Sequence, residues 1–325
     1  MQVLGLQGSP RKKGNTVFMV DAFLQKSAAL GAQTHLVEVD QKNIVACKEY
    51  IVCEKKGFCP IKDDMHSDIY ALIRQADVVL VASPIFFYHI TAQLKGLIDR
   101  CQLFWARKYK LKLNDPKYKT RRGLFMGVAA TRGANLFEGS ETTAKYFFDA
   151  IGAAYDGSLN FRGIEHANDL QEHATALGEI NQTAEKIVSP LLARKKILFV
   201  GQKDAGVAKM ASTLAQYRFG GQIEVDSAAQ QPAAKINPDM AAALTARGID
   251  MAFLRPQALK DALGSRTPEM VITIDNAENP LPDVPFENWE FTAPAVPSEK
   301  TFGKTADDIE QCLETFVKKN ETNLG

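Results

Sequence analysis

Small residues, hydroxyls and cations gather in one short stretch near the start of the chain, directly before a helical pattern. Residues 8–16 read GSPRKKGNT and follow a strand-like segment. Small residues let backbone N–H groups converge, and a helix N-terminus behind them adds partial positive charge, so the stretch suits a phosphate. It is neither the Walker loop, which ends in Gly-Lys-Ser/Thr, nor a dinucleotide G-x-G-x-x-G. A polar loop that only caps the helix is the alternative.

A second stretch has the residues to meet a flat ring. Residues 78–81, VVLV, form a continuous apolar run, which is typical of a strand buried on both faces of a parallel sheet. The run leads into SPIFFYH at 83–89, and a helix is expected from about 91 to 105. Ligands of open α/β sheets lie at the carboxyl ends of strands, so three consecutive aromatics there predict a wall for a planar ligand. Alternatively, Phe86 and Phe87 simply bury under the loop.

Together with three further segments, these stretches resemble the flavodoxin-like NADPH-dependent FMN reductase and iron–sulfur flavoprotein family. The further segments are GFCPIKDDM at 57–65, LKGLIDR at 94–100 and AATRG at 129–133, and the ordered set covers roughly residues 1–190. The resemblance implies that the first loop holds the FMN phosphate, the second lies beside the isoalloxazine, and the segment after the fourth strand contacts the pyrimidine side. The cofactor-binding residues that it implies are Ser9, Arg11, Lys12, Asn15, Thr16, Ser83, Pro84, Ile85, Phe86, Phe87, Tyr88, Thr131, Arg132 and Gly133.

Length and composition predict a soluble protein of two domains. The chain has 325 residues, of which 46% are hydrophobic and 24% charged, as in ordinary globular proteins. A net charge of +1 argues against a general attraction to nucleic acid or membrane, and neither a spanning helix nor a secretion signal is apparent. Five cysteines, an odd number without the density of a disulfide framework, favour a reducing cytoplasm.

Strand and helix patterns alternate along the first half and restart near residue 195. In the first half, strands are expected at 2–7, 34–39, 78–82, 123–129 and 155–159, and helices at 16–30, 64–75, 91–105, 139–151 and 171–188. In the second half, strands are expected at 197–200, 222–226 and 270–274, and helices at 205–217, 238–247 and 305–319. The prediction is α/β, with two tandem three-layer domains: a flavodoxin-like doubly wound parallel sheet at 1–190 and a smaller parallel sheet at 195–325. The Ser189-Pro190 step and the basic triplet at 194–196 mark the boundary.

Residues 106–122 carry eight Lys and Arg side chains against one acid, Asp115. The interleaved Tyr109 and Tyr118 invite a nucleic-acid reading. A solvated, mobile flap is the first interpretation, because the whole chain is nearly neutral. Attraction of an anionic substrate or of the NADPH phosphates comes second, and nucleic acid third.

Three cysteines, Cys47, Cys53 and Cys59, fall in one loop. Cluster-bearing members of the resembled family place four cysteines there, and this chain has Tyr50 where a further one would be expected. A cubane cluster needs four ligands, and zinc would have only His66 as a local fourth ligand. We therefore expect a loop without metal. Cys101 and Cys312 fall on predicted helices and are expected to be buried.

Residues 195–325 resemble the low-molecular-weight protein tyrosine phosphatase and arsenate reductase fold. The segments that carry the resemblance include KKILFV at 195–200, DSA at 226–228, INP at 236–238, ARGID at 246–250 and NW at 288–289. In that family a cysteine nucleophile opens the first loop, an arginine clamps the oxyanion, and an aspartate before a proline is the general acid. Gly201, Val207 and Ala293 stand at these positions here, so the resemblance implies a domain without phosphatase chemistry. Lys203, near Asp204, is the cation left in the loop.

The leading functional hypothesis is an FMN-dependent NAD(P)H oxidoreductase that reduces a quinone, flavin, metal or other small acceptor. Because FMN carries the chemistry, no catalytic side chain is assigned. One alternative is a flavodoxin-like electron carrier whose second domain docks a redox partner protein, and another is a regulatory binding module. The second domain is expected to serve dimerisation or higher homo-oligomerisation, to cover the flavin, or to recognise a partner.

Overall fold

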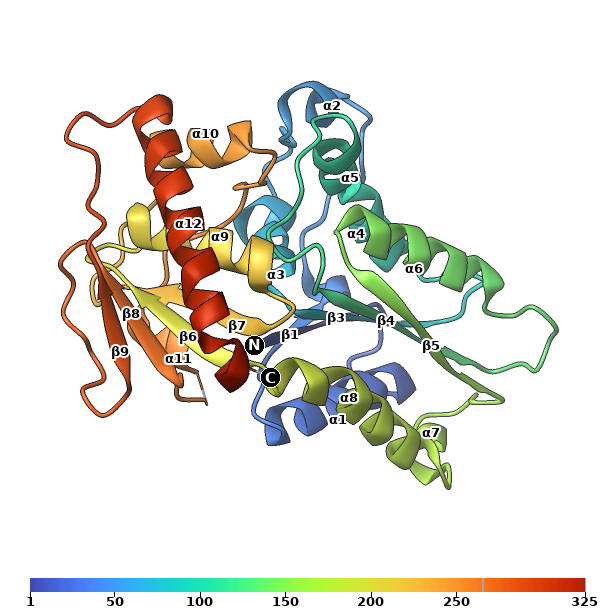
Figure 1. Ribbon diagram of the computed structural model, residues 1–325. Helices are drawn as coiled ribbons and strands as arrows, with labels where there is room; N and C mark the ends of the chain where they lie inside the picture. Colours follow the sequence, from blue (N-terminus) through green and yellow to red (C-terminus); the bar gives the residue numbers. More distant parts are fainter. Residues whose placement is uncertain (265, 325) are drawn as a thin grey trace. The chain divides into compact units, whose positions relative to one another are not determined.

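The structure, a computed structural model, describes residues 1–264 and 266–324 and divides into two compact units (Figure 1). Unit 1 contains residues 1–112 and 120–190, and unit 2 contains residues 113–119 and the chain from Leu191 onward. The segment 113–119 thus lies within the first expected domain along the sequence but packs with the second unit. Within the described ranges, no helix is both long and apolar enough to cross a membrane.

Unit 1 is built on a parallel sheet in the order β2-β1-β3-β4-β5, counted over the described residues. Its strands are β1 (Gln2–Gln7), β2 (Gln33–Glu38), β3 (Val78–Pro84), β4 (Arg122–Ala129) and β5 (Ala154–Arg162). This order is the flavodoxin-like one, in which a ligand crevice opens beside β1 and β3 at the carboxyl edge. Residues 78–82 have no exposed surface, which confirms the expected strand buried on both faces.

Helices cover both faces of this sheet, with α1 and α8 on one and α4 and α6 on the other (Figure 1). The bounds in unit 1 are α1 (Asn15–Ala29), α2 (Val52–Lys56), α3 (Tyr70–Gln75), α4 (Ala92–Arg100), α5 (Gln102–Tyr109), α6 (Glu138–Ala150), α7 (Asp169–Glu172) and α8 (Ala176–Leu192), with short η1 (Val39–Gln41) and η2 (Met65–Ile69). The helix expected at 91–105 is two helices that meet at Cys101. Helix α8 continues through Pro190, so the proline does not end it.

Unit 2 contains a second parallel sheet in the order β7-β6-β8-β9 over the described residues. Its elements are β6 (Lys195–Val200), α9 (Val207–Phe219), β7 (Ile223–Ala228), α10 (Pro238–Ala246), α11 (Leu259–Leu263), β8 (Met270–Ile274), β9 (Phe286–Trp289) and α12 (Glu299–Leu324). Alternation along β6 sends Ile197 and Phe199 into one apolar cluster and Leu198 and Val200 into another. Helix α12 begins before the expected residue 305. The sequence did not predict α11 or β9, which are five and four residues long.

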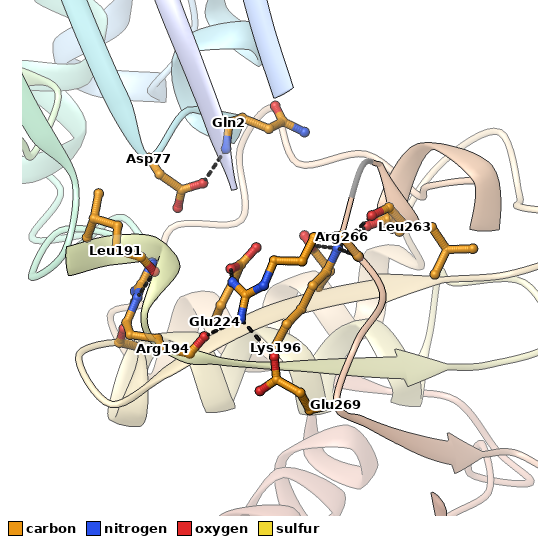
Figure 2. A network of polar contacts seen from close by, with 12 residues as sticks. Gln2, Asp77, Leu191, Arg194, Lys196, Glu224, Leu263, Arg266 and Glu269 are labelled. Atoms are coloured by element: carbon orange, nitrogen blue, oxygen red, sulfur yellow. Dashed lines mark hydrogen bonds and ion pairs between the residues drawn. The ribbon is translucent and has the colours of Figure 1, made fainter. Parts of the chain in front are cut away.

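A buried lysine and a half-buried arginine link this second sheet to the segment around α11 (Figure 2). Lys196, on β6, donates to the carbonyl oxygens of Ala262 and Leu263 at 2.7 and 2.9 Å. Arg266 lies between Glu224 and Glu269, at 2.7 and 2.9 Å. Because these groups satisfy the end of α11 and the turn after it, we assign them a structural role.

The basic segment at 106–122 is not the solvated flap that the sequence predicted. Arg121 is fully buried and donates to the carbonyl oxygens of residues 74, 76 and 151. Lys108 pairs with Asp149 at 2.8 Å. Asn114 exchanges backbone hydrogen bonds with residues 248 and 250, within unit 2. Several of the cations therefore hold the fold together and do not form a free anionic-ligand surface.

Candidate functional site

A pocket of about 140 Å³ lies at the carboxyl edge of the first sheet, where β1, β3, β4 and β5 end. It brings together many of the cofactor-binding residues that the sequence implied, from loops almost 70 residues apart. Those that line it are Ser9, Arg11, Asn15, Thr16, Pro84, Ile85 and Phe86. The structure adds Gly14, Val128, Ala130, Ile164 and Glu165 to the lining.

One end of the pocket is formed by the loop at 9–14 and the start of α1. Gly14 is the residue before the helix and offers no side chain to cap it, so the first N–H groups of α1 have no side-chain acceptor. The Arg11 backbone N–H donates to Ser9 Oγ at 3.2 Å, which closes the loop on itself. Free N–H groups, a hydroxyl and the exposed Arg11 side chain make this end a site for an oxyanion.

The side chain of Asn15 crosses from this loop to the loop after β5. Its amide nitrogen donates to the His166 carbonyl at 2.8 Å, and its oxygen accepts from the Leu170 N–H at 3.1 Å. Asn15, which was expected to bind the FMN phosphate, therefore also positions Ile164 and Glu165, which form the opposite wall of the pocket. These hydrogen bonds could not be predicted from local sequence patterns, because the bonded residues are more than 150 positions apart.

The loop after β3 is fixed to the first loop from below. Ser83 is buried, and its hydroxyl accepts from the Thr91 N–H at 3.1 Å. The Thr91 hydroxyl donates to the Gly8 carbonyl at 2.6 Å. A Cβ at Gly8 would lie 2.7 Å from the Leu94 side chain, so only glycine fits there. Ser83 thus supports the pocket and does not line it.

The aromatic run beyond Phe86 forms a tight turn at the pocket mouth. Phe86 and His89 exchange backbone hydrogen bonds of 2.8 and 3.0 Å, and Phe87 and Tyr88 between them have φ of 48° and 64°. These angles are those of a type I′ turn, which normally takes Gly or Asn. Phe87 is fully exposed, and Tyr88 is half-exposed, so the alternative that Phe87 buries is wrong. Phe86, at 50% exposed, is a pocket wall.

After β4, Ala130 lines the pocket, whereas the residues at 131–133 lie beside this turn and outside the lining. A Cβ at Gly133 would lie 2.6 Å from the Tyr88 hydroxyl, so the phenol rests on that glycine. Arg162 donates to the Gly133 carbonyl at 2.8 Å, and the Arg132 guanidinium packs on Gly163. Thr131, Arg132 and Gly133 are therefore at the rim, with two exposed guanidinium groups.

The cysteine loop of unit 1 is held by a buried ion pair. Arg100 and Asp63 meet at 2.5 Å with almost no side-chain exposure, and Arg100 also donates to the Val45 carbonyl and to Cys59 Sγ at 3.4 Å. Burial opposes ionisation of Asp63, but hydrogen bonds from Arg100 and the backbone keep the pKa of its carboxyl below the usual value. Burial raises the pKa of the Cys53 thiol, and Cys47 and Cys59 raise it further. Among the described residues, no group of three or more His, Cys, Asp or Glu side chains is arranged to hold a metal ion.

The corresponding loop of unit 2, between β6 and α9, contains a buried carboxylate. Asp204 has φ of 48° and a side chain with no exposed surface. Its Oδ2 lies 2.9 Å from Lys209 Nζ and accepts from the Gln257 N–H at 2.7 Å, while its Oδ1 is buried without a partner. Burial raises the pKa of this carboxyl, and Lys209 opposes the rise. The sequence paired Asp204 with Lys203 instead, because the fold that buries Lys209 was not visible in it.

The N-terminal part of the chain is similar in sequence to known proteins. Residues 1–141 match the family of NADPH-dependent FMN reductases. An iron-sulfur flavoprotein of Methanosarcina thermophila is 29% identical over 194 residues, which is 59% of this chain and 95% of that protein. An iron-sulfur flavoprotein of Methanocaldococcus jannaschii is 37% identical over 100 residues, 31% of this chain and 51% of its own. The chain likewise spans about half the length of further iron-sulfur flavoproteins from Archaeoglobus fulgidus and Methanocaldococcus jannaschii. The N-terminal part is therefore homologous to NADPH-dependent FMN reductases and iron-sulfur flavoproteins.

Solved structures with a similar fold cover the same part. An NAD(P)H:quinone oxidoreductase from Methanothermobacter marburgensis is 15% identical, with a TM-score of 0.46 over 57% of this chain and 96% of that one. The class that the family match supports is an FMN flavoprotein oxidoreductase, with FMN as cofactor and NAD(P)H as co-substrate.

Proposed function

We propose that the chain is an FMN-dependent NAD(P)H oxidoreductase that reduces a small acceptor such as a quinone, a flavin or a metal ion. The observation that carries this proposal is that one pocket brings together an uncapped helix N-terminus, Ser9, Arg11 and the aromatic loop after β3. An oxyanion site next to an aromatic wall, at the carboxyl edge of a flavodoxin-like sheet, suits a flavin mononucleotide.

The residues present fit FMN. The enclosed volume is below the roughly 300 Å³ at which sites for small molecules usually begin, so it suits the phosphate and ribityl chain, with the ring at the open mouth. Arg11, Ser9 and the first N–H groups of α1 would bind the phosphate. Pro84, Ile85 and Phe86 would orient the ring.

When bound, FMN supplies the hydride acceptor and electron donor of the reaction. The protein's own part is to orient and to exclude water. Val128 and Ile164 give the pocket an apolar wall, and Ser83 with Thr91 holds the two loops at a fixed separation. The Tyr88 phenol and the Gly133 carbonyl, fixed by Arg162, shape the rim where the acceptor enters.

We also propose that residues 195–325 form a phosphatase-like domain without catalytic activity, which modulates assembly or turnover of the flavin domain. Gly201, Val207 and Ala293 lack the nucleophile, clamp and acid that the chemistry needs. The buried Asp204 supports this proposal, because its carboxylate lies in the loop that would have to hold a substrate phosphate. A homodimer and a cytoplasmic location are expected. Light scattering of the purified protein measures the assembly.

The decisive experiment uses the purified full-length protein. We expect a yellow protein with bound FMN, whose visible absorbance is bleached by NADPH without air and restored by a quinone. Flavin that only a partner protein reduces would favour the electron carrier. A colourless protein that binds no added FMN would favour the regulatory module and contradict the proposal. Aryl phosphate or arsenate turnover would contradict the assignment of a silent second domain.

A further inference from the structure

A second pocket, of about 570 Å³, lies on the other side of the phosphate loop of unit 1. It opens between α1 and the region of α7 and α8. Gly14 lines both this pocket and the flavin pocket, and a Cβ placed on Gly14 would meet nothing within 4 Å. Gly14 is thus the residue that the two linings share, and the second pocket is in the size range of sites for small molecules.

One end of the second pocket is cationic. Lys12 and Lys13 line it, both are exposed, and neither takes part in an ion pair within the described part of the chain. The sequence implied Lys12 as a ligand of the FMN phosphate, but the structure places it here instead of in the first pocket. Two free ammonium groups beside a glycine backbone suit a phosphate or pyrophosphate.

The remainder of the pocket combines an apolar surface with one acceptor. Phe18 is partly exposed on α1, and Leu177 is 52% exposed at the start of α8. Asp21 lies one turn further along α1, and burial together with Glu38 raises the pKa of its carboxyl. A ligand that suits all three features has an anionic end, a flat apolar body, and hydroxyl or amino donors.

We propose that the second pocket binds an adenosine phosphate, with its phosphate on Lys12 and Lys13 and its sugar or adenine donors on Asp21. Two sources share this chemistry. One is the adenosine end of the NAD(P)H co-substrate, and the other is the adenosine half of a flavin dinucleotide that continues from the FMN site past Gly14. The choice of source rests on the proposed flavin function, whereas binding of the adenosine phosphate itself does not.

The binding test is calorimetric titration of the FMN-loaded full-length protein with AMP and with 2′,5′-ADP. We expect saturable binding of one nucleotide per chain, weakened at least tenfold by Lys13→Glu. Lys145→Glu, the same charge change on an exposed position of α6, is the matched control and should leave it unchanged. Absence of saturable AMP and 2′,5′-ADP binding at millimolar concentration, or equal weakening by the two variants, would overturn the proposal.

A second measurement distinguishes the two sources and gives a readout apart from activity. Apoprotein is titrated with FMN and with FAD while flavin fluorescence is followed. Tighter binding of FAD than of FMN, reduced by Lys13→Glu, assigns the pocket to a flavin dinucleotide. Equal binding of both, with AMP competing against NADPH, assigns it to the co-substrate. If NADPH oxidation is normal but neither nucleotide binds, this inference fails while the oxidoreductase function stands.

Discussion

Two strand-to-helix loops of this chain occupy the same position in their sheets, but one borders a pocket and the other contains a buried ion pair. The β1–α1 loop of unit 1 and the β6–α9 loop of unit 2 each follow a strand that is second in its sheet order and lead into a helix of 13 or more residues. In unit 1 the loop ends in Gly14, exposes Arg11 and borders a pocket. In unit 2 the loop encloses Asp204, whose carboxylate pairs with the buried Lys209.

The difference shows that topology provides an anion site only when the loop leaves its donors free. The helix N-terminus is present in both units, and its partial charge attracts any anion. Unit 2 supplies that anion from its own chain, whereas unit 1 leaves the position for a ligand. Position in the fold therefore predicts where a phosphate could bind, and the side chains of the loop determine whether it does.

The largest expected effect comes from removing the donors of the open loop. The double substitution Ser9→Ala with Arg11→Ala should raise the FMN dissociation constant of the apoprotein at least 100-fold, about 3 kcal/mol, because hydrogen bonds to a charged phosphate are lost. Fluorescence titration measures it, and Lys145→Ala is the control for a lost surface cation. An unchanged dissociation constant in the double variant would refute the placement of the phosphate.

A smaller effect is expected from removing the Asp204 carboxylate from the β6–α9 loop of unit 2. Asp204→Gly removes the internal carboxylate, suits the positive φ and leaves Lys209 without its anion. Inorganic phosphate at ten times its dissociation constant should then stabilise unit 2 by about 1.4 kcal/mol in thermal unfolding, with no such effect on the wild type. Adding Lys209→Met should abolish the gain. If phosphate does not stabilise the Asp204→Gly variant, unit 2 does not contain an anion site that Asp204 occupies.

Acid–base behaviour provides a third comparison. Burial raises the pKa of folded Asp204 above its ordinary value of 3.8, so the folded state holds its proton to higher pH than the unfolded state. Stability of unit 2 should therefore fall as pH rises from about 4 through the raised pKa, by about 1.4 kcal/mol for each pH unit that separates the unfolded pKa from the folded one. Asp204→Asn should remove this slope, because an amide in place of the carboxyl does not titrate in that range.

Urea unfolding of both proteins between pH 4 and 7 measures these slopes. The carboxyl faces Lys209 and the Gln257 N–H. Parallel pH profiles for wild type and Asp204→Asn would show that Asp204 does not carry the dependence.

The sequence predicted some elements around the pocket of unit 1, but it predicted neither the opposite wall of that pocket nor the ion pair in unit 2. The apolar run 78–81 and the start of α1 were predicted because strand burial and helix initiation are local patterns. The walls from Ile164 and Glu165 were not, because Asn15 holds them through bonds that span 151 and 155 positions. The Asp204–Lys209 pair was also missed, since the sequence does not reveal that Lys209 turns inward from α9.

The smallest expected effect concerns the cysteine loop of unit 1, where we predict no iron–sulfur cluster. Tyr50 stands where a fourth thiolate would be needed, and Cys59 contacts Arg100. Protein purified without air should contain far less than one iron and one sulfide per chain. Stoichiometric iron with broad visible absorbance would show that three thiolates suffice here and would add a second redox group to unit 1.

The most direct test of the account is the stoichiometry of FMN binding to the full-length apoprotein. Unit 1 has an open phosphate loop and unit 2 a closed one, so calorimetric titration should give one FMN per chain. Lys209→Met should leave both that number and the dissociation constant unchanged, whereas Ser9→Ala with Arg11→Ala should weaken binding at least 100-fold. Two FMN per chain, no FMN, or binding that depends on Lys209 would contradict it.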